Sequence, residues 1–362
     1  MLVFEALNAK FGDCLLLRWQ DAGKDRLAVV DGGPAGVFGR LRDRLDELAV
    51  AGQTLRIDWM MVSHIDDDHI NGLLQLMGEE RTRADNHQPA RYRMVRFWHN
   101  SFEELVGAVP ANAGLSALAG DQSALSQIPA NESKAVLASV TQGRKLGALI
   151  RRFNLDGNTP VGGLVLARQQ PYQVQGLTVT VVGPATKELD ALRVAWAKQA
   201  TTPLAALADM TDKATANLSS IACLVERGGR RILLTGDARG DKVLEGLEAC
   251  GRLAPAGVLE LDVLKVPHHG SDRNVDQAFF ERLPARHYVI SADGVHGNPD
   301  QPTLRWIVQA RGDAEYTIHF TNKVPGIPEL MAQLKTPSRR FKTVFRADAD
   351  KGLAIELPED GD

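Results

Sequence analysis

Short apolar runs, separated by polar residues or by glycine and proline, recur along most of the chain. Runs of this kind are typical of buried strands. The sequence therefore predicts strands at residues 3–6, 14–19, 27–30, 59–62, 94–98, 177–182, 220–226, 231–234, 261–266, 288–290, 316–320, 343–346 and 353–357.

Helical spacing appears between several of these runs. Residues 37–48 form an amphipathic pattern, and residues 241–250 form another. After the strand at 59–62, apolar residues from Ile70 to Met77 recur at the spacing of a helix face. Strands and helices interleave over the full length, with hairpins at both ends. This order favours an α/β fold of two mixed sheets with helices outside, rather than one doubly wound sheet.

The pattern changes in two places. From about residue 102 to 170, Ala, Gly, Ser, Gln and Leu dominate, with short helical patterns at 134–140 and 144–152. A second stretch of this kind covers about 185–216. We therefore predict a single domain over residues 1–362 with two mostly helical insertions, at about 102–170 and 185–216.

Composition limits the class of protein. The net charge is −3, 44% of residues are hydrophobic, and there are three cysteines in 362 residues. This balance is that of a globular protein, and it neither requires nor excludes a nucleic-acid partner. Without an apolar run long enough for a membrane, a signal-peptide pattern or a paired cysteine motif, we expect a cytoplasmic protein with no membrane association.

The densest chemistry lies at residues 63–72, which read SHIDDDHING. His64, Asp66, Asp68 and His69 fall on the turn between a predicted strand and a predicted helix. Imidazole and carboxylate groups both donate lone pairs to divalent ions, so this density is a metal-ligand pattern. Ligands of α/β sheets commonly bind beyond the carboxyl ends of strands, where this turn lies.

Further candidate ligands follow other predicted strands. They are His99, Asp237 and the pair His268 and His269. Together with the first cluster they supply about seven ligands, which suits two divalent ions with three or four protein ligands each. Two such ions can hold a bridging hydroxide as a nucleophile at neutral pH.

The order of these clusters resembles the metallo-β-lactamase superfamily, whose first motif is HxHxDH. Within it, the details are most similar to the metal-hydrolase domains of bacterial competence DNA-uptake channel proteins. The resemblance implies an αββα sandwich and a metal-dependent hydrolase. It rests on residues 63–69, Gly12-Asp13, Asp31-Gly32-Gly33, LLTGD at 233–237, LKVPHHGS at 264–271 and, loosely, 296–299.

The resemblance also implies roles for individual residues. Asp237 would bridge the two metals, Asp68 would also orient the bridging water, and His296 would contact the scissile phosphate or protonate the leaving group. His268 is the favoured ligand of its pair, which leaves His269 for substrate or proton transfer, but the reverse assignment stays open. One metal would be held by His64, Asp66 and His99, the other by Asp68, His69 and a histidine of the pair.

One position departs from the superfamily pattern. Asp66 stands where the motif has its second histidine. A carboxylate is a harder ligand than imidazole and favours Mn²⁺ relative to Zn²⁺. The expected cofactors are therefore two divalent ions, zinc or manganese.

Three functions are compatible with these features. The resemblance favours a phosphodiesterase or nuclease that attacks DNA or RNA through the bridging hydroxide. The same fold could instead hydrolyse a small ester, thioester or lactam. A third hypothesis, from another class, is a regulatory or binding component of a bacterial antiviral defence system with protein partners from the same operon.

Overall fold

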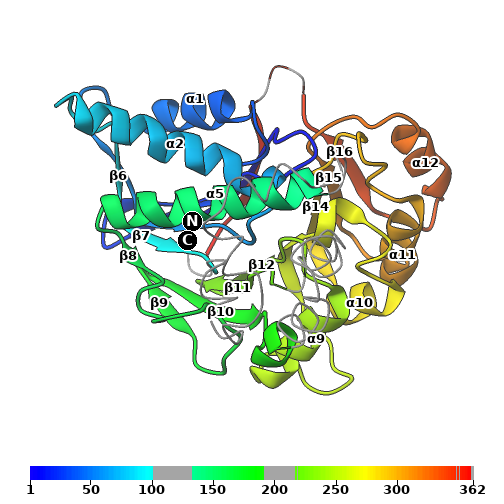
Figure 1. The fold of residues 1–362 in the computed structure, drawn as a ribbon. Helices are drawn as coiled ribbons and strands as arrows, with labels where there is room; N and C mark the ends of the chain where they lie inside the picture. Colours follow the sequence, from blue (N-terminus) through cyan, green and yellow to red (C-terminus); the bar gives the residue numbers. More distant parts are fainter. Residues whose placement is uncertain (101–132, 191–216, 218, 348, 350, 360–362) are drawn as a thin grey trace.

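A computed structural model describes residues 1–362 except 101–132, 191–216, 218, 348, 350 and 360–362. Two large sheets dominate the described part of the chain (Figure 1). The first has the strand order β17-β1-β2-β3-β5-β7-β8, and the strands from β3 to β8 run parallel. Its strands are β1 (Leu2–Leu7), β2 (Leu15–Asp21), β3 (Lys24–Val30), β5 (Trp59–Met61), β7 (Arg96–Trp98), β8 (Asp156–Gly157) and β17 (Gly352–Leu357).

The second sheet has the order β16-β15-β14-β13-β12-β11-β10-β9. Its strands from β9 to β12 pair antiparallel, and those from β12 to β16 pair parallel. A small separate sheet joins β4 (Leu55–Ile57) to β6 (Tyr92–Met94). The strands of the second sheet are β9 (Tyr172–Val174), β10 (Leu177–Gly183), β11 (Ala222–Arg227), β12 (Arg230–Leu234), β13 (Leu261–Lys265), β14 (Ala285–Ile290), β15 (Thr317–Phe320) and β16 (Lys342–Phe345).

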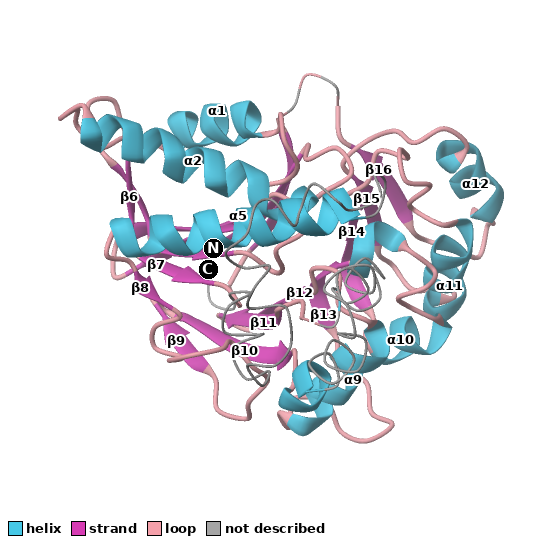
Figure 2. Cartoon of the chain, in the orientation of Figure 1, coloured by secondary structure: helices cyan, strands magenta, loops and turns pink. Residues whose placement is uncertain are grey.

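Helices cover the outer face of each sheet (Figure 2). The first sheet carries α1 (Phe38–Leu48), α2 (Asp67–Asp85) and α5 (Ser133–Arg152). The second carries α9 (Gly240–Ala249), α10 (Gln277–Arg282), α11 (Gln301–Arg311) and α12 (Ile327–Leu334). The predicted αββα sandwich is therefore confirmed.

The burial of β1 shows how the layers are held together. All six of its residues are buried. Phe4 belongs to the core between the sheets, whereas Leu7 belongs to the core under the helices. Alternate side chains of a strand point to opposite faces, so a strand buried on both sides is largely apolar, and Glu5 is the one charged residue of β1. Each such buried side chain contributes about 1.5–3 kcal/mol to folding.

The elements differ from the sequence prediction in a few places. The apolar run at 94–98 is divided between β6 and β7, which belong to different sheets. The two helical patterns near 134–152 form one helix, α5, in which Gly143 faces Ile65. The helices α10, α11 and α12 were not predicted. Much of the two predicted insertions lies outside the described residues, so the domain division stays a prediction.

Glycines bring the start of α2 against the end of β3. A Cβ on Gly32 would lie 2.3 Å from the backbone nitrogen of Leu73, and one on Gly72 would lie 2.0 Å from the Gly32 oxygen. In this close contact the Gly32 N–H donates to the His69 carbonyl at 2.6 Å. The first turn of α2, which carries Asp68 and His69, is thus fixed to the loop after β3. No helix in the described ranges is long and apolar enough to cross a membrane.

Candidate metal centre

The carboxyl ends of strands from both sheets meet at one place. His64 and Asp66 follow β5, and Asp68 and His69 begin α2. From the other sheet, Asp237 follows β12, and the histidine pair at 268–269 follows its parallel neighbour β13. Each apolar strand stops at the same edge of its sheet, so the polar residues that follow are brought together.

Asp237 lies at the centre of this cluster and is 3% exposed. Its Oδ1 is 3.3 Å from His69 Nε2 and 3.5 Å from His269 Nε2. Asp68 completes this group, with its Oδ2 3.3 Å from His269 Nε2 and 3.8 Å from His69 Nε2. One oxygen of Asp237 therefore faces two imidazoles and a second carboxylate.

The other oxygen of Asp237 faces a second group. Its Oδ2 is 3.5 Å from His268 Nε2 and 3.8 Å from His64 Nε2. Asp66 Oδ2 lies 3.6 Å from the same nitrogen of His64. The two oxygens of one carboxylate thus point into two separate sets of imidazole and carboxylate ligands.

The ring nitrogens show what the cluster is built to hold. Nε2 of His64, His69 and His269 is buried and has no hydrogen-bond partner among the described residues, and the same is true of Asp237 Oδ1. Buried polar atoms are normally paired, so inward-facing atoms of this kind indicate a missing ligand. Neutral imidazole nitrogens and carboxylates are the donors that Zn²⁺ and Mn²⁺ accept. The residues therefore fit divalent ions.

The opposite ring nitrogens are held by neighbouring groups. His69 Nδ1 lies 2.9 Å from Asp31 Oδ2, and His269 Nδ1 lies 2.8 Å from the carbonyl of Ser291. His268 Nδ1 lies 2.7 Å from Asn274 Oδ1. Contacts of this type fix the tautomer and orientation of metal-binding histidines, and leave Nε2 for the ion.

Electrostatics within the cluster are strongly coupled. Burial alone would raise the pKa of Asp68, but the imidazoles of His69 and His269 hold it below its usual range. Burial likewise opposes ionisation of Asp237, yet His268, His269 and His69 lower its pKa. Burial opposes protonation of His69, but the carboxylates of Asp237 and Asp68 raise its pKa well above the ordinary value. The carboxylates are thus kept in the ionised form that metal binding requires.

The loop of the histidine pair has an unusual backbone. His268 has φ 46° and His269 has φ 57°, and Gly270 follows with φ 88°. Residues other than glycine rarely adopt the left-handed region, and its cost is of the order of 1–3 kcal/mol per residue. The turn lets two adjacent residues present Nε2 to opposite oxygens of Asp237.

Two further polar contacts lie just behind the ligands, and the sequence analysis assigned them no role. Asp31 accepts from the backbone N–H of Ser63 at 2.7 Å while its other oxygen contacts His69. Asp13 and Lys265 form an ion pair of 2.7 Å in which both side chains are 0% exposed, and Asp13 Oδ1 lies 3.6 Å from His269 Nδ1. Asp13, Asp31 and Lys265 belong to the sequence motifs Gly-Asp, Asp-Gly-Gly and LKVPHHGS. The spacing of these motifs along the sequence does not predict which of the residues contact each other.

Comparison with known proteins agrees with this geometry. The sequence profile of the metallo-beta-lactamase superfamily matches residues 7–295. The chain belongs to the metallo-beta-lactamase superfamily. Membership implies divalent metals, and ligand atoms of Asp13, His69, Asp237 and His269, which lie within 4.8 Å of one another, offer a place for one.

Individual relatives within the superfamily are distant. The chain is 31% identical to ComE operon protein 3 of Bacillus subtilis (strain 168) over 119 residues, which are 31% of this chain and 15% of that protein. The chain thus spans only a small part of that relative's length. Among solved structures, YhfI from Bacillus subtilis shares 11% identity with a TM-score of 0.43, covering 98% of this chain and 99% of the other. A diphosphatase of the PhnP family shares 12% identity with a TM-score of 0.41, covering 99% of each chain.

Two residues matched to the superfamily pattern lie apart from the central contacts. His99 is 7% exposed and forms no ion pair with a described residue, but both of its ring nitrogens are buried without a hydrogen-bond partner among the described residues. Burial, together with the positive charge of Arg151, lowers the pKa of His99 to about 4, which keeps the ring neutral. His296 is exposed and packs edge-on against Phe11 at 4.8 Å. Its assigned role, like that of His99, stays a prediction.

The geometry separates the two histidines of the pair into testable roles. His269 is the third contact of the Asp68 and His69 group, whereas His268 faces the same oxygen of Asp237 as His64 does. We expect His269→Ala to lower divalent-ion affinity by at least about 100-fold, because it removes a direct donor rather than an outer contact. His268 has an 18% exposed side chain, and its Nε2 faces Asp237 Oδ2. His268→Ala should therefore weaken ion binding at the ligand set around Asp237 Oδ2. Titration of the stripped protein with Mn²⁺ and Zn²⁺ would measure both constants. Equal two-site loading of wild type and His269→Ala would contradict the assignment.

Proposed function

We propose that this protein is a two-metal hydrolase of phosphodiester bonds in DNA or RNA. The observation that carries the proposal is the division of Asp237, whose two oxygens each face a separate ligand set. Paired divalent ions suit in-line displacement at phosphorus, because they can stabilise both the attacking and the leaving oxygen. The resemblance of the motifs to DNA-uptake proteins supports a nucleic-acid substrate.

The proposed roles follow from the contacts. His69, His269 and Asp68 would hold one ion, and His64, Asp66 and His268 the other, with His99 as a further predicted ligand of the second ion. When bound, such ions lower the pKa of water and supply a nucleophile at neutral pH. Asp68, whose carboxylate is kept ionised, would orient that water through its free oxygen lone pairs.

His296 would act at the rim of the site. Its loop is tied to the histidine pair, since Asn298 Nδ2 donates to the His268 carbonyl at 3.3 Å. The opposite wall is the loop of Phe11, whose neighbour Gly12 is so close to Asp68 that a Cβ would lie 2.0 Å from its carbonyl oxygen. An exposed imidazole there can contact a substrate phosphate or give a proton to the leaving oxygen.

The proposed setting is the cytoplasm. Cys14, Cys223 and Cys250 are all free and buried. Burial raises the pKa of the Cys223 thiol, which makes it a packing group rather than a reactive one. Free, unreactive thiols suit a reducing compartment. We also propose that the bound ions are zinc or manganese and that the protein has partners from the same operon.

The decisive experiment compares two adjacent carboxylates. Wild type, Asp68→Ala and Asp67→Ala are incubated with single- and double-stranded DNA and RNA in Mn²⁺ or Zn²⁺. Asp67 is exposed and contacts only Asn71 and Gln142 in the described part of the chain, so it is a matched control. We expect Asp68→Ala to lose cleavage by about 10²–10⁴-fold, and Asp67→Ala to retain it.

The other outcomes separate the alternatives. Cleavage that survives in Asp68→Ala comes from a contaminant or from another site. A wild-type protein that binds metal but leaves every nucleic acid intact overturns the nuclease proposal. Hydrolysis of p-nitrophenyl acetate or of a lactam by that same protein would then identify the small-ester function. Metal loading without either activity would favour the regulatory or binding role.

A further inference from the structure

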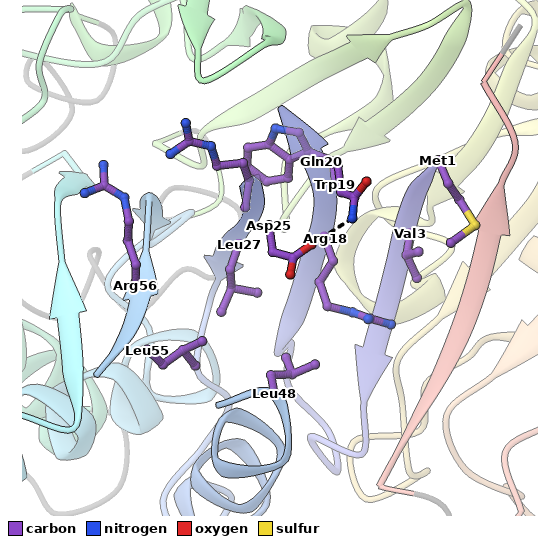
Figure 3. A pocket seen from close by; sticks show the side chains of 11 residues that line it. Met1, Val3, Arg18, Trp19, Gln20, Asp25, Leu27, Leu48, Leu55 and Arg56 are labelled. Carbon is purple, nitrogen blue, oxygen red and sulfur yellow. Dashed lines mark hydrogen bonds between the residues drawn. The ribbon is translucent and has the colours of Figure 1, made fainter. Parts of the chain in front are cut away.

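A cavity of about 350 Å³ opens on the outer face of the first sheet (Figure 3). None of the residues that line it belongs to the Asp237 cluster. Helix α1 ends at Leu48, so it leaves this end of the sheet uncovered. The volume lies in the range of small-molecule pockets, which is about 300–1,000 Å³.

Part of the cavity lining is apolar, and the rest includes the polar side chains of Gln20 and Asp25 and the arginines Arg18, Arg26 and Arg56. Val3 on β1 and Leu27 on β3 form its floor, and each is 4% exposed. Leu48 at the end of α1 and Leu55 at the start of β4 form a wall, and both are half-buried. Four aliphatic side chains from four elements therefore offer a surface for the apolar part of a ligand.

Arg18 brings an incompletely neutralised positive charge to this surface. Its nearest carboxylate, Glu5, lies 3.7 Å from Arg18 Nε. Both oxygens of Glu5 are already taken by Arg44, at 2.8 and 3.0 Å. The Nε of Arg18 is buried and donates to no described residue. Arg18 is thus the more weakly paired of the two guanidinium groups at Glu5, because Arg44 takes both oxygens of Glu5 and also pairs with Glu47 at 2.9 Å.

A carboxylate is also shared on the other side, where Arg26 in addition lies 3.7 Å from Asp21. Arg56 Nε donates to Asp58 Oδ1 at 2.6 Å, and Arg26 Nη1 donates to the same oxygen at 3.1 Å. Asp58 is 0% exposed, so water cannot solvate its negative charge. Figure 3 shows Arg18 and Arg56 on different strands at the cavity, with Leu27 and the Asp25 carboxylate between them.

We propose that this cavity binds a small amphipathic anion, in which a carboxylate or phosphate is joined to a short apolar chain. The anionic end would accept hydrogen bonds from Arg18, whose planar guanidinium matches both oxyanions. The apolar chain would cover Val3, Leu27 and Leu48. The site is separate from the metal centre and does not depend on the proposed function.

Calorimetric titration of the metal-free full chain tests the proposal. The probes are octanoate, octyl phosphate and the uncharged 1-octanol. We expect saturable binding of one or both anions at one site per chain, and much weaker binding of octanol. Arg18→Gln should weaken anion binding by at least about tenfold, as for loss of a hydrogen bond to a charged group. The control is Arg305→Gln, which changes an exposed arginine of α11 on the other sheet.

Arg18→Gln is expected to fold, because Glu5 keeps its two bonds to Arg44. A thermal melt of the variant checks this point. If neither anion binds saturably, or if Arg18→Gln and wild type bind them equally, the site does not exist as described. Binding of octanol as tight as that of octanoate would also overturn the proposal, since the charge would then have no part in recognition. The anion that binds with the higher affinity identifies which headgroup the cavity prefers.

Discussion

Asp237→Ala is expected to abolish stable binding of divalent ions. Each oxygen of Asp237 faces a different ligand set, so removal of this carboxylate takes a donor from both of them. Changes in groups that only support metal ligands cost about 10–100-fold in affinity, and loss of a shared direct ligand should cost more. Metal content after gel filtration, measured by mass spectrometry, should fall from the wild-type value to near zero.

The matched control for this variant is Asp241→Ala. Asp241 lies just beyond the same strand end, but its side chain is 50% exposed and pairs with Arg239. It should retain wild-type metal content. Near-complete metal loading of Asp237→Ala would show that the two ligand sets do not share this carboxylate.

Lys265→Met is expected to destabilise the fold by about 3–5 kcal/mol, because it leaves a buried carboxylate without its partner. Both Lys265 and Asp13 are 0% exposed, and their separation is 2.7 Å. The loss is a large part of a typical domain stability of about 5–15 kcal/mol. Urea denaturation of the metal-free protein, followed by circular dichroism, measures the change.

A double variant distinguishes a buried ion pair from simple packing damage. Replacing both partners, as in Asp13→Leu with Lys265→Met, removes the unpaired charge and should recover much of the lost stability. The control, Lys242→Met, changes a partly exposed lysine that pairs with Glu245, and should alter stability by about 0–1 kcal/mol. If the double variant is as unstable as the sum of the two single variants, the ion pair is not the cause.

The fold and most of the candidate site could be predicted because they depend on short patterns. Each ligand follows an apolar run, and such runs end where strands end. Asp237 and the histidine pair meet because β12 and β13 are parallel neighbours, which places their carboxyl ends side by side. The alternation of strands and helices was sufficient to predict the layered architecture, since each buried strand must be covered on both faces.

Other features depend on contacts that no local pattern records. Asp13 and Lys265 are far apart in sequence, and each sits beside an apolar run that gives no signal of a buried pair. The choice between His268 and His269 depends on a left-handed turn that neither residue type favours. Helices α10 and α12 are short, so their apolar positions make too few turns for a clear period.

The position of the cluster across the sandwich has a mechanical consequence. His64, Asp68 and His69 belong to the first sheet and its helix, whereas Asp237 and the histidine pair belong to the second sheet. An ion held between them would link two layers that otherwise adhere through apolar side chains and through polar contacts such as the Asp13–Lys265 ion pair. Sliding of one layer over the other would separate the ligands that each layer contributes. The geometry of the metal site and the packing of the two sheets therefore depend on each other.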